Sequence, residues 1–184
     1  MMKTKTLKTV LPLGIFMFFM LMLVISAFSQ QSPALSDPEV AHVAVTANQI
    51  DISYAEIAKE KSKDKDILQF AETMVNDHNA VIGQAAALAK KLGVTPADNA
   101  VSQKLLADAE VTKKALKKAS KKDFDKSYID NEVAYHKAVI AAIKDLLIPE
   151  TENNELKELL QNVLPALETH LKHAEKVQKS FMTP

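Results

Sequence analysis

Three histidines lie on the apolar stripes of three predicted helices, and they are the side chains in this chain best suited to bind a metal ion. His78, His136 and His170 each occur among apolar residues spaced three and four positions apart, the pattern of one buried helix face. Imidazole suits zinc, copper and iron. Carboxylates are available nearby, since Glu132 shares a helix face with His136 and Asp51 lies at the edge of another stripe. The candidate metal ligands are therefore His78, Glu132, His136, His170, His173 and Asp51.

The same residues also suit a purely structural role. A histidine on a buried stripe is satisfied by a single hydrogen bond to a neighbouring side chain. A buried carboxylate without a partner is costly, so Glu132 must pair with a histidine, reach water or bind a cation. We expect the structural arrangement with no cofactor, and a site for copper, zinc or iron is the alternative.

Several kinds of chemistry are disfavoured by what the sequence lacks. Di-iron carboxylate enzymes use paired Glu-x-x-His motifs, but the sole such motif runs from Glu39 to His42, at the start of a helix. The residues three positions before the stripe histidines are all apolar. The chain has no cysteine and no Gly-x-Ser-x-Gly, so a catalytic nucleophile has little support. With three glycines, a phosphate-binding loop is equally unsupported.

An internal repeat indicates the elements that must position these side chains. Residues 70–82 and 128–140 match when aligned on their histidines, and both continue as His-x-Ala-Val-Ile. Alanine, leucine, lysine and glutamate are abundant, which indicates an all-α chain. A capping box from Ser36 to Glu39, a stop at Gly93 and a break at Pro149 delimit the helices. The predicted bundle helices are 37–61, 63–92, 123–148 and 153–181, with a weaker crossover helix within 97–120.

The N-terminus predicts export. Three lysines precede an uncharged apolar run from Val10 to Phe28, and Ala27 and Ser29 supply a signal-peptidase site. We expect a signal peptide over 1–29, a disordered lead over 30–36 and a helical domain over 37–184. The run is also long enough to cross a bilayer, so an uncleaved membrane anchor is the alternative. Either outcome places the protein in the periplasm or cell envelope.

The charged residues limit the classes of partner that we expect the protein to bind. Without residues 1–29 the chain keeps 20 basic and 23 acidic residues, and every basic residue is lysine. The absence of arginine argues against nucleic-acid recognition. A lysine-rich segment closes the crossover, and we interpret it as a solvated face, with contact to anionic envelope components as the alternative. Its lysines are Lys113, Lys114, Lys117, Lys118, Lys121 and Lys122.

Several motifs occur together in an order and spacing that resemble one bacterial family. They are Phe70-x-x-x-Met-Val-x-Asp-His78, Leu-Gly-Val94, Phe124-Asp-x-x-Tyr128, His136-x-Ala-Val and Leu164-Pro-Ala-Leu-x-x-His170-Leu. Over residues 37–181 the chain resembles the domain of unknown function 4142 family, whose members are often labelled outer-membrane proteins. The resemblance implies a ferritin-like antiparallel four-helix bundle with a crossover helix and no established reaction. Asp51 stands where that family has a glutamate-rich first helix.

The sequence thus favours an exported, non-catalytic helical bundle of the cell envelope, with a binding, structural or stress-related role. The alternative is a histidine-based metal-binding protein of ferritin-like fold that could be redox-active.

Overall fold

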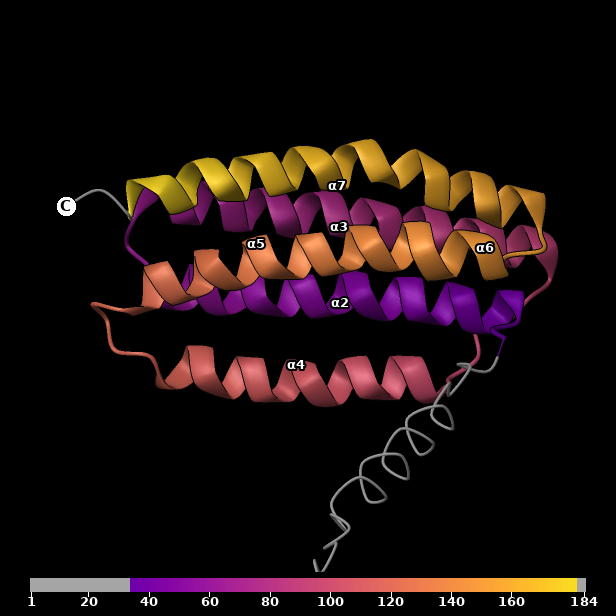
Figure 1. Cartoon of the computed structure of the whole chain (residues 1–184), viewed down its shortest axis with the longest axis horizontal. Helices are drawn as coiled ribbons and strands as arrows, with labels where there is room; N and C mark the ends of the chain where they lie inside the picture. The colour runs from indigo at the N-terminus through magenta and orange to yellow at the C-terminus, as the bar shows by residue number, and fades with distance from the viewer. Residues whose placement is uncertain (1–33, 182–184) are drawn as a thin grey trace, which may run out of the picture. The chain divides into compact units, whose positions relative to one another are not determined.

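Four long helices lie side by side, and a fifth returns the chain from one end of them to the other (Figure 1). The computed structural model describes residues 34–181, which contain no strand. The long helices are α2 (Asp37–Lys61), α3 (Lys65–Leu92), α5 (Phe124–Ala142) and α7 (Asn154–Ser180), and the return helix is α4 (Ala100–Lys118). Between α5 and α7 lie the π-helical segment η2 (Ile143–Leu147) and the short α6 (Ile148–Glu150). The predicted all-α bundle with a crossover helix is confirmed.

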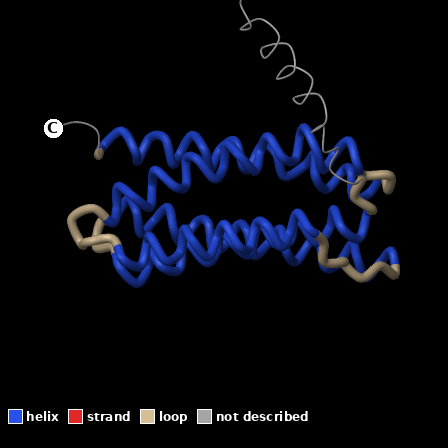
Figure 2. Tube along the Cα trace, turned by 60° about the horizontal axis from the view of Figure 1, so that its bottom comes forward, coloured by secondary structure: helices blue, strands red, loops and turns tan. Residues whose placement is uncertain are grey.

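The crossover makes every neighbouring pair of bundle helices antiparallel. Because α4 carries the chain back, α5 starts at the end where α2 finishes, and Lys61 lies over the ring of Phe124 there. At the opposite end, Asp37 accepts hydrogen bonds from the backbone of Glu152 and Asn153. Figure 2 shows two layers, with α5 and α7 in one and α2, α3 and α4 in the other.

Local signals set the helix ends. Glu39 accepts a hydrogen bond from the backbone of Ser36 at 2.9 Å, as the capping box predicts. The cap of α3 is Asp64, which accepts hydrogen bonds from the second and third backbone N–H groups of the helix, so α3 begins two residues later than the predicted residue 63. Gly93 ends α3 with φ of 68°, in the left-handed region that favours glycine.

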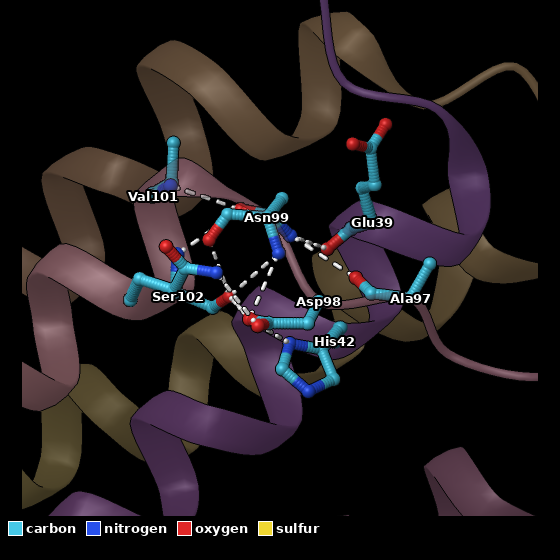
Figure 3. Close-up of polar contacts among 8 residues, drawn as sticks. Glu39, His42, Ala97, Asp98, Asn99, Val101 and Ser102 are labelled. Atoms are coloured by element: carbon cyan, nitrogen blue, oxygen red, sulfur yellow. Dashed lines mark hydrogen bonds and ion pairs between the residues drawn. The ribbon is translucent and has the colours of Figure 1, made fainter.

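A polar network fixes the start of α4 to α2 (Figure 3). Asn99 accepts from the backbone of Val101 and Ser102, each at 3.0 Å, and donates to the carbonyl of Glu39 at 3.2 Å. His42 faces Asp98 in the same network, with 3.8 Å between Nδ1 and Oδ1. His42 therefore belongs to the α2–α4 junction and not to the other histidines.

The apolar core has two parts with a polar layer between them. On α5, Val133 belongs to one part and Ile140 to the other, and His136 lies between. On α7, Ala174 and Leu167 flank His170 in the same way. The fold thus brings the stripe histidines to one level of the bundle.

The helix predicted over 123–148 is longer and less regular than expected. After Ala142 it widens into η2, where the backbone N–H of Ile148 bonds to the carbonyl of Ile143, five residues back. Pro149 then sits in the first turn of α6, a position that needs no N–H donor. The π segment therefore lets the helix continue to Glu150.

The predicted signal peptide, residues 1–29, lies outside the described residues, as does most of the lead over 30–36. At the end of that lead Leu35 is buried, and its backbone N–H donates to Glu150. None of the helices within 34–181 has the length and apolarity needed to cross a bilayer. Lys113 pairs with Glu110, and the contact with anionic envelope components stays a prediction.

Candidate metal centre

Each of the four bundle helices contributes at least one polar side chain to the layer between the two cores. Asp51 comes from α2, His78 from α3, His136 from α5 and His170 from α7. All four are buried, with Asp51 fully inaccessible and His170 only 5% exposed. Glu132, one helical turn before His136, is also fully buried. Five of the six predicted ligands are therefore close together.

The ring of His78 is oriented by an amide. Its Nδ1 lies 2.6 Å from Oδ1 of Asn48, and the Asn48 amide nitrogen donates to the carbonyl of Ala44 at 2.8 Å. Because the amide nitrogen is engaged with a carbonyl, the amide oxygen faces the ring and Nδ1 must carry the hydrogen. Nε2 of His78 is then left with a free lone pair.

The other two histidines are held in the same way by different acceptors. Nδ1 of His136 lies 3.0 Å from the backbone carbonyl of Glu132, so it donates that bond. Nε2 of His170 lies 2.9 Å from a carboxylate oxygen of Asp77 and donates to it. Each imidazole therefore has one nitrogen engaged with an acceptor that fixes its tautomer, as metal-ligating histidines almost always do.

The remaining polar atoms of the cluster are buried and have no hydrogen-bond partner within the described residues. They are Nε2 of His78, Nε2 of His136, Nδ1 of His170 and both carboxylate oxygens of Asp51. The three ring centroids form a nearly regular triangle with sides of 5.4, 5.6 and 5.9 Å. One nitrogen of each ring lies within 4.8 Å of one nitrogen of each other ring. An unpaired buried polar atom costs free energy, and this layer has several together.

The separations in the cluster suit an ion better than they suit hydrogen bonds. Oδ2 of Asp51 lies 3.4 Å from Nε2 of His78 and 3.6 Å from Nε2 of His136. These distances exceed the usual 2.7–3.2 Å of an N–H···O bond. Four ligands at about 2.0–2.1 Å from a tetrahedral zinc ion are about 3.3–3.4 Å apart. The residues present therefore fit a metal ion held by the three imidazoles, with the Asp51 carboxylate close to His78 and His136.

Burial shifts the pKa values of several side chains in and around the cluster. It lowers the pKa of His136 and of His170, although Asp51 and Asp77 act in the opposite direction, so both imidazoles favour the neutral form that binds metal. Burial, reinforced by Asp51, raises the pKa of Glu132 well above its usual range. Burial also raises the pKa of Tyr128, whose hydroxyl has no partner within the described residues.

Glu132 and Asp51 lie on different sides of His136. Oε2 of Glu132 is 3.6 Å from Nδ1, the nitrogen that already donates to a backbone carbonyl, whereas Asp51 lies near Nε2. Asp51, Glu132 and His136 nevertheless form a second close group, with one ligand atom of each within 4.8 Å of the others. Glu132 therefore lies close to His136 but outside the three-imidazole group.

The sixth predicted ligand lies elsewhere. His173 is half-buried, and its ring packs edge-on against Phe70 with 5.2 Å between centroids. Conversely, Asn48 and Asp77 had not been singled out in the sequence. Asn48 precedes Asp51 by three positions on the same helix face, and this spacing is the signal that could have identified it.

A cavity of about 680 Å³ opens beside the cluster. Asp51, His78, His136 and His170 all contribute to its wall, whereas Glu132 does not. An ion bound by the first four residues would therefore lie beside the cavity.

Comparison with known proteins gives a family and no characterised relative. The family model described as "Domain of unknown function (DUF4142)" matches residues 25–177. No curated protein and no solved structure matches the chain.

Proposed function

Because the chain belongs to the DUF4142 family, a domain of unknown function, we propose a function from its own residues: it binds a transition-metal ion. The ligands are Asp51, His78, His136 and His170. The ions that suit this nitrogen-rich set are zinc, copper and iron.

One observation carries the proposal. Three buried imidazoles each use one nitrogen for an acceptor on their outer side, and the other nitrogen of each is unpaired. A buried histidine with a single hydrogen bond leaves its second nitrogen unpaired at some cost, and three such nitrogens in one cluster exceed what packing alone requires. A bound ion would satisfy all the unpaired nitrogens and one oxygen of Asp51 at once.

The position of the ligands also supports this function. They come from four different helices, and each is held by regular backbone on both sides. Sites on rigid elements keep their geometry better than sites on loops. The cavity beside the cluster also gives a further, non-protein ligand a path to the ion.

Metal content and thermal stability test the proposal. The full chain, purified without a histidine tag or chelator, should contain about one zinc, copper or iron per molecule. In metal-free protein, an ion at about 100 times its dissociation constant adds about 2.7 kcal/mol, which for a chain of this size raises the melting temperature by about 5–11 °C.

The His78→Ala/His136→Ala double variant should lose both the metal and the rise in melting temperature. His42→Ala is the matched control, because His42 belongs to the α2–α4 junction and should leave both unchanged. No metal-dependent rise in the wild type, together with a stable Asp51→Leu/His78→Leu variant, would instead establish a structural polar layer.

We also propose that the protein is exported to the cell envelope, on the basis of the lysine-led apolar run and the Ala27-Phe28-Ser29 cleavage site. Protein recovered from the envelope should begin at Gln30, as intact mass would reveal. A mass that includes Met1, with the protein in the membrane fraction, would indicate an anchor.

A further inference from the structure

The cavity beside the cluster is elongated along the bundle. Its wall runs on α2 from Asp51 back to Ala41 and on α7 from His170 back to Leu156. At 1.5 Å per helical residue these stretches cover about 15 Å and about 21 Å. Both point towards the same end, because α2 and α7 begin there. The volume of about 680 Å³ falls within the usual range for small-molecule sites, about 300–1,000 Å³.

The two ends of the cavity differ in chemistry. Around the cluster the wall includes Asn48, Tyr54, Asp77 and Thr112 in addition to the metal-binding residues. Towards the other end the wall is almost wholly apolar, with contributions from both layers and from η2. These residues are Val43, Val45, Val81, Val139, Ile143, Leu147, Leu156, Leu160 and Val163. Such a cavity suits a ligand that has a long apolar part and a single polar group at one end.

We propose that the cavity binds a fatty acid, with its carboxylate on the metal ion and its hydrocarbon chain along the apolar wall. This inference rests on the proposed metal site. The four ligands are three imidazoles and one carboxylate, which leave a divalent ion with one net positive charge. The carboxylate of Asp77, which contacts His170, is 52% exposed, so solvent screens its charge from the ion. A carboxylate supplies an oxygen ligand and the opposite charge together, and a buried unbalanced charge is otherwise costly.

The length of the cavity indicates how long a hydrocarbon chain it can hold. An extended chain of bonded atoms covers about 3.5 Å for every three bonds, so about 15 Å corresponds to about a dozen bonds. Dodecanoate therefore fits the compartment, and octanoate leaves part of it empty. Each methylene that enters an apolar site improves affinity about fourfold, so affinity should rise steeply between these two acids and level off beyond the length of the cavity.

The experiment uses the full chain loaded with Co²⁺, whose absorption bands report its ligands. Dodecanoate should change the cobalt spectrum and bind with a measurable heat, while acetate at the same concentration, which has no chain, should do neither. Metal-free protein should bind dodecanoate at least about tenfold more weakly, because the carboxylate then loses its partner. Equal affinity with and without the metal, or equal effects of dodecanoate and acetate, would overturn the inference.

A variant that fills the apolar part of the cavity provides a second test of the inference. Val163 lies seven residues, about 10 Å, before His170 along α7, so Val163→Phe fills the compartment without touching the ligands. It should keep the cobalt spectrum and lower dodecanoate affinity at least about tenfold, the equivalent of about two lost methylenes. Val111→Phe is the matched control, because Val111 is 70% exposed on α4, and it should leave dodecanoate binding unchanged.

The two proposals fail in different ways. Absence of cobalt binding in the wild type overturns the proposed metal site and, with it, this inference. Cobalt binding with an unchanged spectrum and no heat on adding dodecanoate overturns the fatty-acid inference and leaves the metal site in place.

Discussion

At the scale of single residues, the acceptors behind the histidines are as informative as the histidines themselves. Asn48 and Asp77 hold His78 and His170 so that one nitrogen of each ring remains free. Loss of such an outer partner typically lowers metal affinity about 10–100-fold, because the ring can then turn or change tautomer. We therefore expect Asn48→Ala and Asp77→Ala each to weaken metal binding by about that factor.

Competition with a coloured chelator measures the affinity, and Asn76→Ala is the control on the same helix, since Asn76 is exposed and next to Asp77. If all three variants bind the metal equally well, the outer hydrogen bonds do not orient the ligands.

The sequence predicted most of the cluster and could not predict its geometry. Helical periodicity identified the buried face of each histidine, and the i,i+4 spacing identified Glu132. The level of each histidine along the bundle depends on how far the helices are shifted relative to one another. The sequence of a single helix does not specify that shift. His173 is on the same side of α7 as His170 but one turn further along, where it meets Phe70. Asp77 is exposed, so its pattern was that of a solvent-facing residue.

At the scale of helices, the predicted elements match the observed ones closely because the stripes are long and their ends carry clear signals. The differences arise where two signals compete. Ser62 and Asp64 both suit a cap, and the carboxylate of Asp64 accepts two backbone N–H groups of α3. Pro149 suggested the end of a helix, yet η2 allows the chain to continue through it. A π segment has no simple sequence pattern.

Core truncation tests the helix faces. Met74 on α3 is fully buried, and Met74→Ala should lower the free energy of unfolding by about 2–5 kcal/mol, through lost burial and the cavity left behind. Lys117→Ala on the exposed side of α4 should change it by no more than about 0.5 kcal/mol. Urea unfolding of both variants gives the comparison, and losses of similar size would contradict the predicted faces.

At the scale of the whole molecule, the two layers explain why the cavity was not foreseen. Its wall draws on α2, α3 and α4 from one layer and on α5, η2 and α7 from the other. The apolar residues that line it have the same helical spacing as residues that fill a core. Whether such a stripe packs tightly or encloses a space is decided by the distance between the layers.

The proposed metal ligands come from four different helices, so an ion bound to them would link distant parts of the chain. Asp51 and His170 are separated by 119 positions in the sequence, and an ion bound to both closes that stretch into a loop. For a covalent link, closing a loop of about 100 residues is worth about 4.7 kcal/mol in the chain-entropy estimate. This chain has no cysteine and so cannot form a disulfide. The ion would serve as its reversible cross-link, and the stability of the protein would follow the supply of metal rather than the redox state of its surroundings.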